Sequence, residues 1–249
     1  MKTKVVSFNI RHCDDKDGNS VSERAPRLSR IVLPYDADVI GFQEYSEAWV
    51  EYINKDFSDE YEIFNKWRAK SNHESAPILW KKNKFKCIDK GFFWLSDTPE
   101  KESRGWDERF NCYRICQWVI LQEKSSGNCF TFMNTHYGFG DKGQCDSADL
   151  IYEYSKKISY FPTLITGDFN MTPDSLGYAQ ITKYFNDTNI ERDMCDTYHG
   201  YDPSVQRDSH IDYCFVSDSI LPLSQKVIKT KIDEKYPSDH FGLYIELDI

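Results

Sequence analysis

Short apolar runs alternate along the chain with segments in which apolar residues recur every three or four positions. The runs predict buried β-strands, and the wider spacing predicts amphipathic helices. Strands are expected at 4–10, 38–44, 61–64, 76–80, 85–95, 114–122, 129–136, 162–166, 211–216 and 241–247. Helices are expected at 21–33, 46–55 and 146–158, with a fourth beginning near Asp174. Segments 96–111 and 138–143 are expected to be loops.

The succession of elements repeats. A strand that ends near Asn9, a helix, and a strand that ends at Glu44 are followed later by a strand that ends near Asn134, a helix, and a strand that ends at Asp168. No linker or low-complexity segment divides the chain, so residues 1–249 are expected to form one domain. We therefore predict an α/β fold of two related halves whose acidic strand ends meet in a shared cleft.

The net charge and the length of the apolar runs narrow the range of possible functions and locations of the protein. The net charge of −9 argues against a protein that binds long duplex DNA through non-specific phosphate contacts, although a local basic patch or bound cations would still permit a nuclease. The charge favours a small phosphorylated substrate. No apolar run approaches the length of a membrane helix, and no signal peptide is recognisable. A cytoplasmic monomer is expected, or a secreted protein if a signal peptide has been removed.

Eight cysteines are present, without a C-x-x-C pair. Cys112 and Cys116 lie four residues apart, and no second pair has zinc-binding spacing. We expect reduced thiols packed in the core; disulfides remain an alternative for a secreted protein.

Polar side chains mark the ends of six predicted strands. They are Asn9, Glu44, His136, Asp168 with Asn170, Asp212, and Asp239 with His240. Each has an ordinary explanation, such as a turn cap, an interior ion pair or a hydrogen-bonded histidine. Buried strands rarely all end on polar groups without a common cause, and a hard divalent cation supplies one.

The residue types suggest a division of roles. Glu44 is the best single ligand for Mg²⁺, and Asp239 and Asn9 would complete the shell. His240 with Asp212, and His136 with Glu74, are expected to be histidine–carboxylate pairs that fix a tautomer. At spacing two on one strand, Asp168 would polarise the attacking water and Asn170 would bind a phosphate oxygen. The alternative for these last two is a polar turn.

These motifs together resemble the endonuclease/exonuclease/phosphatase superfamily, which includes deoxyribonuclease I and nocturnin-like enzymes. The matching segments are 7–10, 40–44, 134–136, 167–170, 211–213 and 238–240. The resemblance implies a four-layer α/β sandwich (α+β in some schemes), with two mixed β-sheets face to face and helices outside. It also implies Mg²⁺-dependent phosphoester hydrolysis, with Mn²⁺ as a substitute.

In that pattern His136 and His240 stabilise the charge that develops on the phosphoryl group in the transition state, and Asp212 holds His240. The formal base stays open between Asp168 and His240, as does the number of metal ions. Segments 91–99, 105–107 and 114–116 resemble a bacterial branch without a secure substrate, whose nearest characterised relatives are nocturnin-like. That branch often has a basic residue where this chain has Ser209 and His210.

Substrate contacts are expected from loops around the cleft. Arg114 would bind a phosphate, or be an ordinary strand arginine. Trp106 would stack on a base or sugar, or pack on its own domain. Tyr137 would line the cleft, or pack beside His136. Lysines 81, 82, 84 and 86 would meet nucleic acid, although a solvated hairpin explains them better.

The function expected from the sequence is a metal-dependent hydrolase that directs water at the phosphorus of a phosphodiester. It would be a nuclease, or a phosphodiesterase for nucleotides or other small molecules. The alternative is a phosphomonoesterase for inositol phosphates or sugar phosphates. A non-catalytic binding protein on the same fold is a third possibility, but such a protein should have lost part of the constellation, and none is missing.

Overall fold

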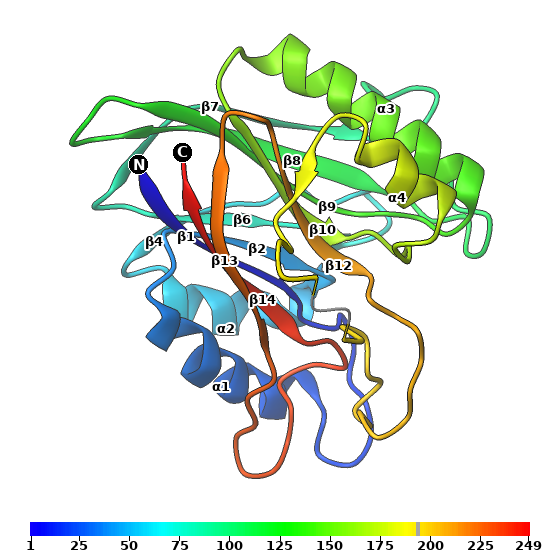
Figure 1. Ribbon diagram of the computed structural model, residues 1–249. Coiled ribbons are helices and arrows are strands. Elements are labelled where there is room, and N and C mark those ends of the chain that lie inside the picture. The colour runs from blue at the N-terminus through cyan, green and yellow to red at the C-terminus, as the bar shows by residue number, and fades with distance from the viewer. Residues whose placement is uncertain (193–194) are drawn as a thin grey trace.

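Two six-stranded mixed β-sheets pack face to face in the computed structural model, which describes residues 1–192 and 195–249 (Figure 1). The first sheet has the strand order β13–β14–β1–β2–β6–β4, formed by β1 (Lys2–Asn9), β2 (Val39–Gln43), β4 (Tyr61–Phe64), β6 (Ile78–Lys81), β13 (Leu221–Ile228) and β14 (Gly242–Asp248). The second has the order β11–β12–β10–β9–β8–β7, formed by β7 (Phe85–Trp94), β8 (Ile115–Glu123), β9 (Cys129–His136), β10 (Thr163–Asp168), β11 (Asn186–Asp187) and β12 (Asp212–Val216). Two short strands, β3 (Tyr45–Ser46) and β5 (Glu74–Ser75), pair with each other.

Helices cover the outer face of each sheet. The first sheet carries α1 (Val21–Val32), the short 3₁₀ helix η1 (Leu33–Tyr35) and α2 (Glu47–Phe57), and the second carries α3 (Asp141–Ile158) and α4 (Leu176–Ile181) (Figure 1). The predicted four-layer sandwich is thereby confirmed. None of the described helices has the length and hydropathy needed to cross a membrane.

Strand alternation assigns side chains to the layers. In β1, Val6 and Phe8 face α1 and α2, whereas Val5 joins the core between the sheets. In β10, Ile165 faces α3 and Leu164 faces inward. Because successive side chains alternate, both faces of each central strand are buried, which is why these strands are continuous apolar runs in the sequence.

The inner faces change from apolar to polar along the strands. Asn134, completely buried in β9, is at the centre of this change. Its amide nitrogen donates to the carbonyls of Phe42 (2.7 Å) and Pro77 (2.9 Å). Its amide oxygen accepts from Gln43 Nε2 (2.8 Å) and Thr166 Oγ1 (3.0 Å). Every hydrogen-bonding position of this amide is used, so Asn134 links the two sheets without an unsatisfied polar group.

The repetition predicted from the sequence is present in the topology. Strands β1 and β2 are parallel neighbours joined through α1, and β9 and β10 are parallel neighbours joined through α3. Asp212 and the Asp239–His240 pair, expected at strand ends, instead begin β12 and precede β14. Those strands run antiparallel to their neighbours, and an antiparallel strand begins at the edge where its partner ends. The side chains therefore still reach the same edge.

Two further expectations were wrong. The segment 138–143 is only partly a loop, because α3 already begins at Asp141. Strand β13 was missed because it is an edge strand with many exposed residues and a register shift after Pro222, so its apolar pattern is weak.

Gly41 tests the importance of close contact between the sheets. A Cβ atom at this position would lie 2.4 Å from Thr166 Oγ1 and 2.6 Å from Asn134 Oδ1. We expect Gly41→Ala to lower the free energy of unfolding by about 2–3 kcal/mol, because an atom is forced into a filled core. Urea unfolding measures this value.

Gly127→Ala is the matched control. No atom lies within 4 Å of the added methyl there, and only the positive φ of 78° opposes the change, at a cost of about 1 kcal/mol. An equal loss of stability in both variants would contradict the proposed role of Gly41.

Candidate active site

The polar strand ends converge on one cleft of about 800 Å³. Its lining includes eight residues expected from the sequence: Glu44, Glu74, Arg114, His136, Asp168, Asn170, Asp239 and His240. The register of the second sheet explains the centre of the cleft, because Asp168 lies opposite His136 on β9 and opposite Asp212 on β12. Asn9 and Asp212 are buried beside them.

Backbone turns with positive φ present the functional side chains. Arg11, Glu44 and Asn170 follow β1, β2 and β10, with φ of 61°, 57° and 49°. Asn9 Oδ1 accepts from the backbone N–H of Arg11, and Asp168 Oδ1 accepts from that of Asn170, both at 3.0 Å. The two halves thus use the same Asx turn. Residues other than glycine cost free energy when their backbone is left-handed, and such residues concentrate at functional sites.

Asn9 joins the two sheets at the floor of the cleft. Its amide nitrogen donates to Glu44 Oε1 (3.2 Å) and to Asp168 Oδ2 (2.8 Å). One buried amide therefore fixes the separation of two carboxylates that belong to different halves of the molecule.

His240 is a buried cation. Its Nδ1 lies 2.9 Å from Asp212 Oδ2, and its Nε2 lies 3.8 Å from Asp168 Oδ2. Burial opposes the charged ring, but the adjacent carboxylates, Asp212 foremost, raise the pKa of His240 to about 10. The imidazolium is therefore the protonated form at neutral pH, with Nε2 directed at the centre of the cleft.

Asp168 differs from His240, because burial and the charge of Asp212 shift its pKa in the same direction. Burial, and then the negative charge of Asp212, raise the pKa of Asp168 to about 7, although His240 and the amide of Asn9 act in the other direction. A carboxylate whose pKa lies near neutrality is suited to accept a proton from a nucleophile.

His136 is held by Asn170 rather than by the expected carboxylate. Its Nε2 lies 3.0 Å from Asn170 Nδ2 and 3.5 Å from Asp168 Oδ2. The predicted hydrogen bond to Glu74 is absent: the separation is 4.0 Å, and Glu74 instead pairs with Arg68 at 2.6 Å. Burial, followed by the charge of Arg114, holds the pKa of His136 well below its ordinary value. His136 and His240 therefore differ in charge.

A divalent cation fits the part of the cleft floor that is formed by Glu44, Asp239 and Asn9. Arg11 lies between Glu44 (3.8 Å) and Asp239 (3.7 Å), so these two carboxylates already converge on one positive charge. Burial raises the pKa of Asp239, and the negative charge of Glu44 adds to this effect, although His240 and Arg11 act in the other direction. Carboxylate and amide oxygens of Glu44, Asp239 and Asn9 form the hard donor set that Mg²⁺ prefers.

A second group of potential ligands lies close by. Asp168, Asp212 and His240 offer ligand atoms within 4.8 Å of one another. Here His240 Nδ1 is already engaged by Asp212, and the set includes a nitrogen donor. The all-oxygen side is therefore the better match to Mg²⁺.

Two expected substrate contacts are not supported. Tyr137 is completely buried and packs against Phe169, with ring centroids 4.7 Å apart, so its phenol does not reach the cleft. Trp106 is not among the cleft-lining residues and donates from Nε1 to Asp97. Arg114 does line the cleft, but it is buried against Asp107 (3.1 Å).

Several cleft residues were missed. They are Arg11, Arg68, Arg109, Phe110, Phe139, Tyr198, Asp208 and Ser209. All lie outside the regular strands and helices, where hydrophobic periodicity carries no signal. His12 also lines the cleft and contacts Glu44 through Nδ1 (2.7 Å) and its backbone N–H (3.0 Å).

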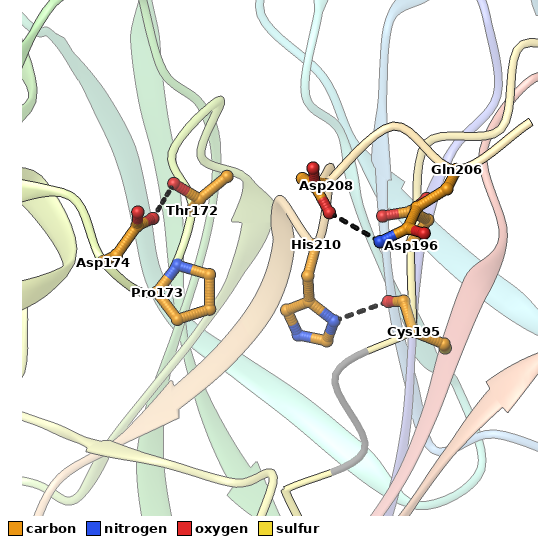
Figure 2. Close-up of a pocket in the computed structure, with 8 residues that line it drawn as sticks. All are labelled: Thr172, Pro173, Asp174, Cys195, Asp196, Gln206, Asp208 and His210. Atoms are coloured by element: carbon orange, nitrogen blue, oxygen red, sulfur yellow. Dashed lines mark hydrogen bonds between the residues drawn. The ribbon is translucent and has the colours of Figure 1, made fainter.

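A second cavity of about 450 Å³ flanks the cleft (Figure 2). Asp208 lines both cavities. His210 is buried, and its Nδ1 lies 2.8 Å from the carbonyl of Cys195, as Figure 2 shows. Asp196 accepts from the backbone N–H groups of Arg207 and Ser209. The polar groups of this cavity therefore support the loop, and only Ser209 of the Ser209–His210 pair faces the cleft.

Comparison with known proteins agrees with this geometry. A model of the Endonuclease/Exonuclease/phosphatase family matches residues 6–240. The solved structure of a mannosyl-6-phosphatase from Bacteroides thetaiotaomicron superposes with a TM-score of 0.90 and 29% identity, covering 99% of this chain and 100% of that chain. The human nocturnin catalytic domain shares the fold, with a TM-score of 0.73, 16% identity, and 99% and 94% coverage.

A curated relative is the exoribonuclease subunit Ccr4 of the Saccharomyces cerevisiae CCR4-Not complex. It is 25% identical over 193 residues, which cover 64% of this chain. The matched region is 23% of the length of Ccr4.

The raised pKa of Asp168 predicts how stability depends on pH. With a folded pKa of about 7 against 3.8 for the free group, Asp168 stabilises the fold fully below pH 4, and this contribution is lost as the pH rises to 7. In EDTA, wild type should lose about 2 kcal/mol more than Asp168→Asn between pH 5 and pH 8. Urea unfolding at both pH values measures the difference.

His240 must be separated from this effect. Its contribution is fully present below pH 6.5 and is lost as the pH rises through 10, and Asp212, the carboxylate that raises this pKa most, is retained in both proteins. Between pH 5 and pH 8 the difference between the two stability curves therefore reports chiefly on Asp168. Parallel curves from pH 5 to pH 8 would show that Asp168 titrates normally.

Proposed function

The chain belongs to the Endonuclease/Exonuclease/phosphatase family and is a hydrolytic phosphoesterase; on this premise we propose that it uses Mg²⁺ and an attacking water to hydrolyse small organic phosphates. The observation that carries this proposal is the arrangement around Asp168. This carboxylate, with a pKa near neutrality, lies between a neutral His136 and a protonated His240. Phosphoryl transfer to water requires a base that can accept a proton beside an acid that can donate one.

Each side chain has a task in this mechanism. Asp168 takes the proton of the attacking water as the water oxygen bonds to phosphorus and the bond from phosphorus to the leaving oxygen breaks, and the leaving oxygen takes a proton from solvent. Asp168 is preferred to His240 as the base because His240 is already protonated. His240 donates from Nε2 to a phosphoryl oxygen, and Asp212 stabilises its positive charge. Asn170 donates its two amide hydrogens to His136 Nε2 (3.0 Å) and to the carbonyl of Tyr137 (2.9 Å), so it holds His136 in place, and it would bind a second phosphoryl oxygen by releasing one of these bonds.

The cation would be held by Glu44 and Asp239, with Asn9 beside them. It would supply neutralisation of charge on the phosphate. Arg11, which bridges these carboxylates, would keep them close together before the cation binds.

The cleft supports a small substrate better than a nucleic acid duplex. A volume of about 800 Å³ lies within the range of small-molecule sites. The net charge of −9 opposes a long polyanion. The similarity to a mannosyl-6-phosphatase over almost the whole of both chains favours the phosphomonoesterase alternative over the phosphodiesterase first expected. Hydrolysis of single-stranded RNA is the second candidate, and the similarity to Ccr4 supports it.

We expect Asp168→Asn and His240→Asn each to lower kcat about a thousandfold, because each removes a proton-transfer group. EDTA should abolish activity, and Mg²⁺ or Mn²⁺ should restore it. The assay is phosphate release from sugar phosphates, inositol phosphates and nucleotides, alongside cleavage of single-stranded RNA and of bis(p-nitrophenyl) phosphate.

Asp187→Asn is the matched control. Asp187 is a largely buried carboxylate that accepts from Tyr178 outside the cleft, so its loss should leave kcat unchanged. Wild-type activity in Asp168→Asn would refute the mechanism, and RNA cleavage without phosphate release would favour the nuclease.

A further inference from the structure

Four arginines line the cleft: Arg11, Arg68, Arg109 and Arg114. Three of them pair with carboxylates, Arg11 with Asp15 (3.0 Å), Arg68 with Glu74 (2.6 Å) and Arg114 with Asp107 (3.1 Å). Arg109 makes no ion pair with any residue that the structure describes. Its guanidinium is therefore the cleft arginine that is not committed to a carboxylate among the described residues.

Two phenylalanines bracket this guanidinium. Its Cζ atom lies 4.9 Å from the ring centroid of Phe110 and 5.1 Å from that of Phe139. The two rings are 5.5 Å apart and nearly perpendicular, at 74°. Contacts between a guanidinium and aromatic faces hold the cation in place without neutralising it. We refer to Arg109, Phe110 and Phe139 as the aromatic clamp.

The backbone fixes the aromatic clamp in the cleft. Asp107 Oδ1 accepts from the N–H groups of Arg109 (3.0 Å) and Phe110 (2.9 Å), while Asp107 Oδ2 holds Arg114. The N–H of Glu108 donates to the carbonyl of Phe139 (3.0 Å). One buried carboxylate thus neutralises Arg114 and also forms the turn that presents Arg109.

The ring of Phe110 is available to a ligand. The residue is 55% exposed although it lines the cleft. A large apolar ring at a concave site, beside an unpaired cation, is suited to contact a flat or ring-shaped group. The guanidinium fork matches a carboxylate or a phosphate with two parallel hydrogen bonds.

We propose that the aromatic clamp binds the leaving-group half of the substrate, and that this half is a ring with a second anionic group. This inference rests on the proposed function and adds to it the substrate class: organic phosphates that carry another phosphate or a carboxylate in addition to the scissile phosphate. Arg109 pairs with the second anion, and Phe110 packs against the ring.

The experiment uses matched pairs of substrates that differ only in the second anion. They are glucose 6-phosphate with glucose 1,6-bisphosphate, and adenosine 5′-monophosphate with adenosine 3′,5′-bisphosphate. With Mg²⁺ present, the wild-type KM should be about tenfold lower for the bisphosphate of the preferred ring. Arg109→Ala should raise that KM about tenfold, change the monophosphate KM less than twofold, and leave kcat unchanged. Arg109→Lys should give an intermediate KM.

Arg104→Ala is the matched control. Arg104 lies in the same segment and also packs on an aromatic ring, that of Tyr113 at 5.0 Å, but it does not line the cleft.

Phe110→Ala should raise KM about fivefold for both members of a pair, because both lose the ring contact. An unchanged bisphosphate KM in Arg109→Ala, or an equal change in Arg104→Ala, would overturn the inference.

A binding measurement separates this inference from the proposed function. Calorimetric titration of Asp168→Asn with each member of a pair, in Mg²⁺, requires no turnover. A bisphosphate that binds no more tightly than its monophosphate overturns the inference even if the enzyme is active. Tighter binding that is lost in Asp168→Asn/Arg109→Ala supports it even if wild type hydrolyses neither compound, an outcome that would count against the proposed function alone.

Discussion

The active site depends on a buried amide network that joins two β-sheets. Asn134 bonds to the backbone of the first sheet and to Thr166 of the second, and Gly41 leaves the space in which this contact fits. Two residues further along β9 and β10 come His136 and Asp168, and Glu44 directly follows the end of β2. Since a shift of one residue would turn each inward side chain to the other face, the network sets the register of the whole site.

Burial is the common cause of the unusual charge states in the cleft. It raises the pKa of Asp168 and Asp239 and lowers that of His136. His240 and Glu44 are exceptions: Asp212 outweighs the cost of burying the charge of His240, and the hydrogen bond from His12 holds the pKa of Glu44 well below its ordinary value. A site with this excess of buried carboxylate is most stable when a cation or a proton compensates it. The same excess of buried carboxylate would favour the binding of a divalent cation.

The sequence predicted the layers and the centre of the site but not its walls. Asp168, Asn170 and His240 could be identified because they stand beside continuous apolar strands in recognisable motifs. Strand direction was not predictable from those motifs, so Asp212 was expected at the wrong end of its strand. For Tyr137 and Trp106 the sequence left open both a cleft contact and packing, because the pattern does not show whether an aromatic residue faces the core or a cleft. Arg109 and Phe110 lie in a loop whose conformation depends on the buried Asp107, which is a tertiary contact.

The pairing of the first strand with the last has a consequence for how the protein acquires its site. Strand β1 pairs with β14 from Lys2↔Asp248 to Ser7↔Leu243, and His240 lies immediately before β14. Contacts between residues so distant in sequence form slowly, because a long loop must close before they contribute. During synthesis, His240 emerges after every other residue proposed for the site. Despite the internal repetition, neither half should have activity alone, and a nascent chain should acquire the complete site only after β14 has paired with β1.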